Sequence, residues 1–371
     1  MLGGLSQLDF LRRYWHKQPL LIRRAIPGFA PPLAKAALFR LAGRDDVESR
    51  RVSRRGRNWS LESGPFAAGR LRAPPAREWT LLVQGVDLHH AGASALLHRF
   101  DFIPAARLDD LMISYAVDGG GVGPHFDSYD VFLLQAHGRR RWRISTQRDK
   151  TLVAGAPLKI LRDFRPRQEY LLEPGDMLYL PPGCAHEGVA VGECMTCSIG
   201  FRAPSATELA RGMLEHLADT VERKGMYADP MLRPTATPAH LDDAFVNQAA
   251  RLIGALRPSR DQVAEYLGRS LSEPKPNVIF HAPAARLSRT AFVRAVERGG
   301  LMLDIRSRML HRASRIYING DVVSASGAGL ASISELADKR LLGPECRLSA
   351  GTADLFYAWY TYGWLHPGDE S

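Results

Sequence analysis

Hydrophobic and polar residues alternate in short runs through the middle of the chain, between residues 111 and 201. Gly, Pro and Asp separate these runs, which are LMISYAV, DVFLLQA, RRRWRIS, EYLLE, DMLYLP, GVAV and MTCSIGF. Alternation with a period of two residues between turn-forming residues predicts half-buried β-strands. Many short strands at this spacing predict a β-sandwich or a β-barrel.

The part of the chain before residue 111 mixes helix and strand. Residues 8–15 have the spacing of a short helix, and KQPLLIRRAI reads as a short strand entered through Pro19. Further strands are expected in RVSRRGRNWSLESGPF and EWTLLVQGVDL, with polar or glycine-rich breaks between them. These strands would extend the predicted β-domain toward the N-terminus.

The pattern changes from strand to helix after FRAPS, at residues 201–205. Residues 206–225 have helical spacing, and one side of this helix carries Leu209, Met213, Leu214, Leu217 and Val221. A proline-rich link leads to two more helical runs, at residues 241–256 and 261–271. Three helices of this size make a thin bundle. Because such a bundle often completes its core with a second copy, we expect a homodimer.

The segment SEPKPN marks a second boundary, at residues 272–277. Beyond it, the pattern predicts a β-hairpin in RIYINGDVV, with Asn319-Gly320 as its turn, and helices in RTAFVRAVERG, ASISELADKR and TADLFYAWYTYGWL. Helices with a small β-ribbon fit a winged-helix module. The predicted fold class is therefore mixed α and β, with a barrel domain at 1–204, a helical dimerisation domain at 205–273 and a winged-helix domain at 274–371.

The composition agrees with a folded, water-soluble chain. Hydrophobic residues make up 45% and charged residues 24%, with no long polar tract. The N-terminus is interrupted by charges and lacks the apolar core of a secretion signal. No apolar run approaches the roughly 20 residues of a membrane span. We therefore expect a cytoplasmic protein without membrane contact.

Cysteine content and net charge bear on three further possibilities: disulfides, a metal or redox site, and a nucleic-acid partner. Four cysteines are too few for a disulfide framework at this length. Cys194 and Cys197 form a C-x-x-C, but we expect buried thiols rather than a metal or redox site, because no second pair stands at zinc-site spacing. The net charge of +10 raises the possibility of a nucleic-acid partner. Since the predicted C-terminal helices are nearly neutral, we do not expect direct nucleic-acid binding.

Two segments of the predicted barrel carry candidate metal ligands. In GPHFD, His125 and Asp127 are two residues apart, so in an extended strand both side chains point to the same side. In EPGDMLYLPPGCAHEG, a turn leads into a strand that ends by presenting His186. Two imidazoles and a carboxylate form the facial triad of non-haem iron(II), which leaves positions open for a cosubstrate and oxygen. A His-x-Asp pair alone also arises by chance, but the turn and the distal histidine favour the metal site.

A run of arginines follows, in HGRRRW. After a turn expected at Gly138, alternation sends Arg140 and Trp142 into the barrel and the other arginines outward, where a solvated face is the simpler interpretation. A cation inside a barrel requires an anion, and a guanidinium takes a carboxylate through two parallel hydrogen bonds. A dicarboxylate could chelate iron at one end and pair with Arg140 at the other. The metabolite 2-oxoglutarate has this chemistry.

The segments HFDSYDVFLLQAHGRRRW, PGDMLYLPPGCAH and SIGFRAP closely resemble the bacterial JmjC-type ribosomal oxygenases of the YcfD type, which are arginine hydroxylases. The resemblance extends to FLRRYWHKQPLLIRRA, FIPAARLDDLMISYAVDGGGVGPH, YADPMLRPTATPAH and RIYINGDVV, so it covers nearly the whole chain. It implies a double-stranded β-helix (cupin/JmjC) catalytic domain, a helical dimerisation domain and a winged-helix domain. It also implies the activity: with iron(II), 2-oxoglutarate and O2, hydroxylation at the β-carbon of one arginine of large-subunit ribosomal protein sixteen, releasing succinate and CO2.

The resemblance also implies roles for individual residues. By position in the matching motifs, His125, Asp127 and His186 would bind iron, and Arg140 would bind the cosubstrate carboxylate. Ser114 falls where the family also contacts 2-oxoglutarate. The related human-type histidine hydroxylases carry lysine at the position of Arg140, which favours the bacterial arginine branch.

Asp118 and Tyr129 are candidates for substrate binding. Asp118 precedes GGGVGPH and could accept a substrate guanidinium, because glycines let a peptide approach the backbone closely. It could equally do no more than open a turn. Tyr129, with Tyr115 and His137, could flank the entering side chain or simply pack.

Three other functions stay open at this point. The same iron centre could demethylate N-methyl-lysine or N-methyl-arginine, or hydroxylate histidine on another protein. A cupin-like barrel beside a winged helix could also be a ligand-sensing DNA-binding regulator, although the near-neutral C-terminal helices argue against it. Only the substrate pocket distinguishes the oxygenase reactions from one another.

Overall fold

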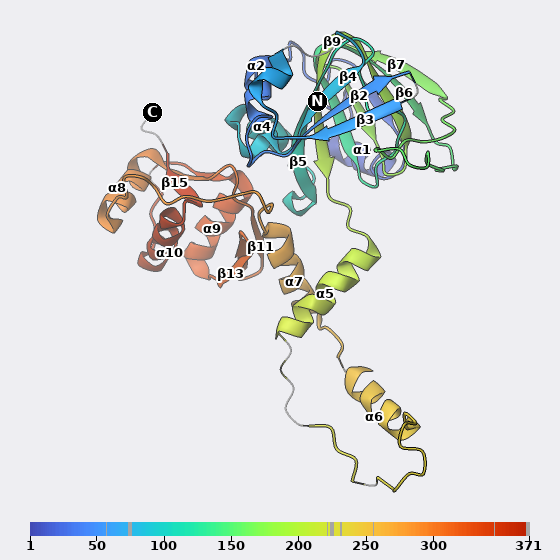
Figure 1. Ribbon diagram of the computed structural model, residues 1–371. Coiled ribbons are helices and arrows are strands. Elements are labelled where there is room, and N and C mark those ends of the chain that lie inside the picture. Colours follow the sequence, from blue (N-terminus) through green and yellow to red (C-terminus); the bar gives the residue numbers. More distant parts are fainter. Residues whose placement is uncertain are drawn as a thin grey trace.

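The structure, a computed structural model, describes residues 1–56, 58–72, 76–220, 222, 226–230, 232–254, 256–344 and 346–368. Figure 1 shows a β-barrel built by the N-terminal half of the chain and a smaller unit of helices and strands built by the C-terminal residues. The helices between them in sequence lie below the barrel, and the middle one projects away from both units. The predicted division at 204/205 and 273/274 stays a prediction.

The barrel is formed by one nine-stranded sheet among the described residues, in the order β1-β8-β6-β9-β5-β4-β2-β3, with β7 paired to β6. All of its strand pairs are antiparallel. The strands are β1 (Leu20–Ile22), β2 (Ser49–Arg55), β3 (Asn58–Ser63), β4 (Trp79–Val83), β5 (Leu108–Ala116), β6 (Val131–Ser145), β7 (Gln168–Leu172), β8 (Met177–Leu180) and β9 (Ala185–Phe201). The prediction of a barrel is confirmed. Its long strands β6 and β9 pair with each other from Val131 to Ser145.

The alternating side chains of the strands lie in two different places. One set packs in the main hydrophobic core, and the other set lines the cavity inside the barrel. On β5, Ile113 belongs to the main hydrophobic core, while Ser114 lines the barrel cavity. On the first half of β6, Phe132 belongs to the core and Leu133 lines the cavity. Successive side chains of a strand point to opposite faces, so one set of strands builds both the core and the site.

Strand β6 runs straight through the predicted turn, so the expectation of a turn at Gly138 is wrong. The register with β9 shifts on both sides of His137, which marks a bulge rather than a reversal. Gly138 has φ +59°, and a Cβ at this position would lie 2.0 Å from the carbonyl oxygen of Glu193. Only glycine fits such a bend. In the same way, the predicted strands GVAV and MTCSIGF both belong to β9.

Short helices cover the core face of the barrel. The α-helices are α1 (Gln7–Arg13), α2 (Lys35–Leu41), α3 (Ala68–Arg72) and α4 (Ala91–Leu97), and the 3-10 turns are Val86–Leu88, His98–Phe100 and Ala105–Arg107. Helix α1 confirms the predicted N-terminal helix. Its Phe10 is fully buried, with ring centroids 5.4 Å from Phe132 and 4.9 Å from Tyr179. The N-terminal segment is therefore part of the barrel domain.

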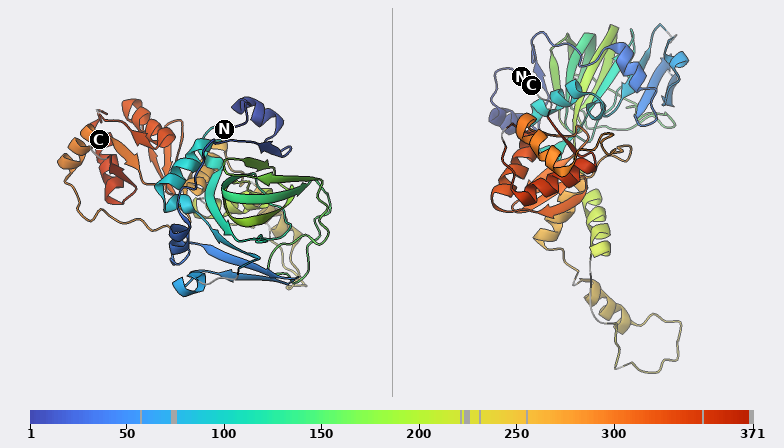
Figure 2. Two further views of the ribbon diagram at one scale, coloured as in Figure 1. Left: turned by 90° about the horizontal axis from the view of Figure 1, so that it is seen from above. Right: turned by 90° about the vertical axis from the view of Figure 1, so that its left-hand side faces the viewer.

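The three helices after the barrel are α5 (Ala206–Thr220), α6 (Asp243–Gly254) and α7 (Arg260–Ser272). The helices exist as predicted, but they do not form a three-helix bundle within one chain. Helices α5 and α7 pack together, whereas α6 lies apart from them and has no buried residue (Figures 1 and 2). On α5, Met213 and Leu217 are buried and Leu214 is exposed. Val221, predicted on the same side, lies outside the described residues.

The C-terminal unit has its own core and two small sheets. Its elements are α8 (Arg289–Gly299), β10 (Leu301–Leu303), β11 (Met309–Arg312), β12 (Arg315–Ile318), β13 (Asp321–Ser324), α9 (Gly327–Lys339), β14 (Leu341–Leu342), α10 (Ala350–Thr361) and β15 (Leu365–Pro367). The predicted hairpin is confirmed, because β12 and β13 pair across Asn319 and Gly320, both at positive φ. Helix α7 packs against this hairpin as well as against α5, and so connects the C-terminal unit with the helix that follows the barrel.

The structure also describes the cysteines and the helices of the chain as a whole. Cys194 and Cys197 are fully buried, belong to different hydrophobic clusters and form no disulfide, so the expectation of buried thiols is confirmed. None of the helices in the described parts of the chain is long and apolar enough to cross a membrane.

Candidate metal and cosubstrate site

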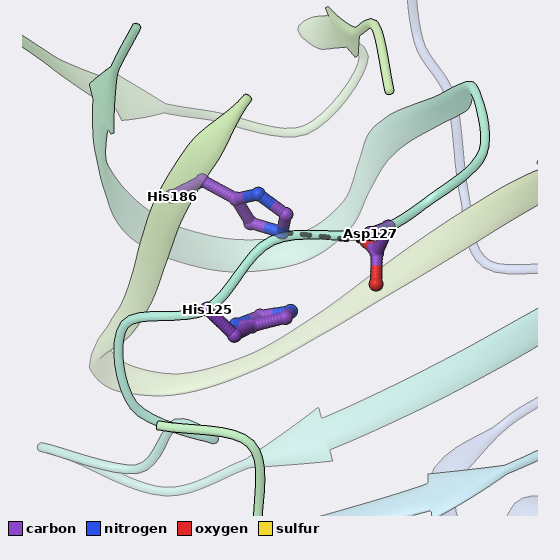
Figure 3. Close-up of side chains that lie close together, drawn as sticks. All are labelled: His125, Asp127 and His186. Atoms are coloured by element: carbon purple, nitrogen blue, oxygen red, sulfur yellow. Dashed lines mark ion pairs between the residues drawn. The ribbon is translucent and has the colours of Figure 1, made fainter. Parts of the chain in front are cut away.

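Three side chains converge at one end of the barrel: His125, Asp127 and His186 (Figure 3). One ligand atom of each lies within 4.8 Å of those of the other two. His186 is the second residue of β9, whereas the sequence pattern placed it at the end of the preceding strand, which is β8. His125 and Asp127 lie in the loop between β5 and β6 rather than on a strand. The backbone of His125 nevertheless pairs with that of His186 through two hydrogen bonds of 2.9 and 2.8 Å, which brings the two imidazoles together.

Hydrogen bonds to carbonyl oxygens orient both imidazole rings. Nδ1 of His125 lies 3.0 Å from the oxygen of Gly123, and Nδ1 of His186 lies 2.9 Å from the oxygen of Cys184. A carbonyl can only accept, so each Nδ1 carries the proton and each Nε2 keeps a free lone pair. Nε2 of His186 lies 3.6 Å from a carboxylate oxygen of Asp127. These three donors suit a divalent transition metal such as iron(II).

Burial keeps His186 in the state that binds metal. Burial, and after it the neighbouring His125, lower the pKa of His186 to about 4. The imidazole is therefore neutral near neutral pH, and only a neutral imidazole has a lone pair to give.

The loop that carries His125 and Asp127 is anchored at its far end by Asp130. This carboxylate is fully buried, accepts a hydrogen bond from the Tyr179 hydroxyl and lies 3.2 Å from Nδ1 of His16. Burial, followed by the Asp130 carboxylate, raises the pKa of Tyr179, so its hydroxyl stays a donor. The N-terminal segment and β8 thus fix the loop three residues after a candidate metal ligand.

A cavity of about 440 Å³ opens beside the three ligands, inside the barrel. Arg140 lines this cavity, and the residue as a whole is 5% exposed. Nη1 of Arg140 donates to the hydroxyl oxygen of Ser114 at 3.1 Å, but Nε and Nη2 have no partner. No acidic side chain of the described residues forms an ion pair with Arg140. A buried guanidinium with two free donors on one edge is prepared to receive a carboxylate.

Two further unpartnered polar atoms are buried around the same cavity. They are the Thr80 hydroxyl, on β4, and Nε1 of Trp142, on β6. The sequence placed Trp142 inside the barrel without a role and did not single out Thr80. Thr80 reaches the cavity because β4 pairs with β5, and a threonine in a strand gives no local signal of that position.

The remaining predicted residues lie at different distances from the cavity. Tyr129 lines it and is 39% exposed. Asp118 is not among the lining residues: its carboxylate pairs with Arg77 at 2.8 Å and accepts from the amide of Gly192 at 3.0 Å. Tyr115 is buried in the core instead. His137 is exposed.

The structure explains why glycines follow Asp118, and the explanation differs from the one expected from the sequence. A Cβ on Gly120 would lie 2.3 Å from the carbonyl oxygen of Trp79, and one on Gly121 would lie 2.5 Å from that of Gly188. The glycines therefore allow this loop to cross the protein's own strands. They are not evidence for the approach of a peptide, and the role of Asp118 stays a prediction.

Comparison with known proteins places the chain in a family. Family models match residues 95–209 (JmjC domain), 254–366 (ROXA-like winged helix) and 164–272 (AraC-like ligand binding domain). The ribosomal protein uL16 3-hydroxylase of Escherichia coli (strain K12) is 33% identical over 323 residues, which are 86% of each chain. This chain belongs to the JmjC-domain ribosomal oxygenases. A probable ribosomal oxygenase of Haemophilus influenzae is 36% identical over 209 residues, which are 55% of this chain and 51% of that protein.

Solved structures of ribosomal oxygenases have the same architecture. YcfD, a ribosomal oxygenase from Escherichia coli, in complex with cobalt and 2-oxoglutarate, superposes with a TM-score of 0.84 at 31% identity over 98% of both chains. The JmjC barrel and the winged-helix unit of this ribosomal oxygenase are therefore family features, as the sequence predicted.

Proposed function

We propose that this protein is an iron(II)- and 2-oxoglutarate-dependent oxygenase that hydroxylates the β-carbon of an arginine side chain in the large-subunit ribosomal protein uL16, with release of succinate and CO2. The observation that carries the proposal is the Arg140 guanidinium, buried with two free donors in the same cavity as His125, Asp127 and His186. Relatives named for a uL16 3-hydroxylase activity and for bound cobalt and 2-oxoglutarate support it.

The protein contributes binding and orientation to this reaction. His125, Asp127 and His186 would hold the iron, and the free Nε and Nη2 of Arg140 would hold the far carboxylate of 2-oxoglutarate. The Ser114 hydroxyl oxygen accepts a hydrogen bond from Nη1 of Arg140 and so fixes the guanidinium. Bound iron(II) supplies the activation of O2 that couples oxidation of 2-oxoglutarate to insertion of one oxygen atom into a C–H bond.

Another part of the cavity wall would receive the substrate side chain. Asp109, Asp110 and Tyr129 line this wall. Burial, and next the charge of Asp127, raise the pKa of Tyr129, which therefore stays a neutral hydrogen-bond donor. Carboxylates and a phenol suit a cationic side chain such as arginine better than a neutral one. Asp118 would bind the guanidinium only by exchanging its exposed partner Arg77 for the substrate.

We also propose that the protein is a cytoplasmic homodimer. Helix α6 exposes an apolar face that one chain leaves uncovered, with Phe245 45%, Val246 42%, Leu252 49% and Ile253 66% exposed. Leu214 of α5 is 67% exposed as well. A second copy of the chain would bury these side chains. A ribosomal protein as substrate accords with the cytoplasm.

The decisive experiment combines two readouts on purified, iron(II)-loaded protein with 2-oxoglutarate. Succinate is measured with and without uL16, and uL16 is searched by mass spectrometry for an arginine that has gained one oxygen atom. We expect succinate formation that depends on uL16 and a hydroxylated arginine. Both should disappear in His125→Ala and in Arg140→Ala.

Other outcomes would select another function. Binding of 2-oxoglutarate without a change in uL16 mass would refute arginine hydroxylation of uL16 and direct the search to methylated or histidine-containing peptides. A protein that binds neither metal nor 2-oxoglutarate would refute the oxygenase itself and leave the ligand-sensing regulator.

A further inference from the structure

The barrel meets the segment between α7 and α8, and the C-terminal unit, through a group of charged side chains near the start of β5. We call this group the interdomain cluster: Asp109, Asp110, Arg202, Lys275 and Arg308. Nζ of Lys275 lies 3.0 Å from Asp110 and 3.5 Å from Asp109. Arg308 donates to the backbone oxygen of Asp109 at 2.7 Å, and Arg202 donates to the backbone oxygen of Leu271, in α7, at 3.0 Å. Contacts therefore cross the boundary in both directions.

The acids of the interdomain cluster belong to the active-site cavity at the same time. Asp109 and Asp110 line it, five and four residues before Ser114 on the same strand. A Cβ on Gly200 would lie 3.6 Å from a carboxylate oxygen of Asp110 and 4.0 Å from the ring of Tyr129, so both side chains flank one point of β9. Lys275 and Arg308 thus contact the same residues that form the wall proposed to receive the substrate.

Lys275 is the central cation of the interdomain cluster. Asp110 is 3% exposed, and its other partner is the amide of Gly85, at 3.0 Å. Although burial acts to lower the pKa of Lys275, the carboxylates of Asp110 and Asp109 hold it above its usual value, so the ammonium stays charged. Removing it would leave a buried carboxylate without its counter-ion, which is among the costly changes in a protein interior.

We propose that Lys275 is a positioning residue for the substrate protein: from the segment between α7 and α8 it holds Asp109 and Asp110, and with them the cavity wall at the start of β5, in the geometry that binds the substrate side chain. The inference rests on the proposed function for the identity of the substrate. It assigns a role in the reaction to the segment that joins α7 to the C-terminal unit, through the wall that this segment supports.

The test compares Lys275→Met with the unaltered protein and with Lys339→Met, an exposed lysine of the C-terminal unit that pairs with Glu335. For Lys275→Met we expect the KM for uL16 to rise between about tenfold and a hundredfold, as small displacements of binding groups do. The KM for 2-oxoglutarate should change by no more than about twofold, the range of a remote substitution. Lys275→Arg should restore most of the binding, whereas Lys339→Met should leave all constants unchanged.

A second readout needs neither metal nor activity. Hydrogen exchange of the metal-free protein should be faster in β5 and at Gly85 in Lys275→Met, because the Gly85 amide loses a fixed acceptor. Lys339→Met should exchange like the unaltered protein. If Lys275→Met does not fold, Lys275→Gln, which keeps hydrogen-bond donors but removes the charge, is measured in the same way and with the same expectation.

An unchanged KM for uL16, a parallel loss in the KM for 2-oxoglutarate, or unchanged exchange in β5 would each overturn the proposal. Failure of the proposed function gives a different result. In that case the unaltered protein hydroxylates no arginine of uL16, while the exchange measurement still decides whether Lys275 holds this wall.

Discussion

Nη1 of Arg140 donates to the hydroxyl oxygen of Ser114 at 3.1 Å, from β6 to β5 across the interior of the barrel. The contact uses one edge of the guanidinium and leaves the other edge, Nε and Nη2, without a partner. A protein that buries a cation in this way gives up stability, and the arrangement is reasonable only if a ligand completes it.

Arg140→Met should therefore have opposite effects on binding and stability. The KM for 2-oxoglutarate should rise by about 10- to 100-fold, since hydrogen bonds to charged groups contribute about 1.5–3 kcal/mol. The ligand-free variant should unfold at the same or a higher temperature, because replacing a buried charge by a methionine of similar volume is neutral or stabilising. Steady-state kinetics and calorimetry measure the two effects.

The neighbouring Arg141 provides the control. Its side chain is 52% exposed and pairs with Glu169 on the outer face. Arg141→Met should change neither the KM for 2-oxoglutarate nor the melting temperature appreciably. A ligand-free Arg140→Met that melts well below the unaltered protein would show that the guanidinium is structural.

Thr80 tests whether the cavity holds more of the cosubstrate site than the sequence revealed. Its hydroxyl is buried without a partner, and valine has the same shape without the hydroxyl. If the hydroxyl bonds a ligand, Thr80→Val should raise the KM for 2-oxoglutarate or for uL16 by about 2- to 10-fold, the range of a neutral hydrogen bond. The ligand-free variant should be at least as stable. Unchanged constants for both ligands would remove Thr80 from the site.

The bulge of β6 shows why the site was only partly predictable. Val131 and Leu133 line the cavity at odd positions, but Arg140 and Trp142 line it at even positions, so the bulge near Gly138 shifts the alternation by one residue. The sequence prediction had the right face for Arg140 because it assumed a turn at Gly138 and restarted the count there. Strict alternation along one strand would have placed Arg139 inside.

Other parts of the fold depended on contacts that no local pattern contains. The strands and the C-terminal hairpin follow from period-two alternation and turn residues, so they were predictable. The separation of α6 was not, because its apolar face predicts burial without saying against what. Thr80 and the interdomain cluster were missed for the same reason: their partners lie far away in sequence.

Asp87 makes the stability of the protein depend on pH. This carboxyl group is 4% exposed, and burial, followed by the neighbouring Asp110, raises its pKa to about 7. The folded protein therefore keeps a proton that the unfolded chain releases above its ordinary pKa of about 3.9. Since Asp87 binds more protons in the folded state in this window, its contribution to stability falls as the pH rises from about 4 to about 7 and then levels off.

Asp87→Asn should remove this dependence. The amide oxygen can still accept from the amide of Leu111, as the carboxylate does at 2.8 Å. The variant should gain melting temperature over the unaltered protein at about pH 8 and much less at about pH 5. Asp338→Asn, at a side chain 68% exposed, is the control and should show no such difference. An equal gain at both pH values would contradict the assignment to Asp87.

The apolar face of α6 gives the test of the homodimer. Ile253 is 66% exposed in the single chain, and an aspartate there would be harmless in a monomer but would bury a charge in an interface. We expect Ile253→Asp to weaken self-association by at least about a hundredfold, because a buried unpaired charge costs several kcal/mol. Light scattering or sedimentation over a range of concentrations measures the change. Asn247→Asp, an exposed polar position of the same helix, should leave association unchanged. If the unaltered protein is monomeric at all concentrations, the apolar face must serve another partner.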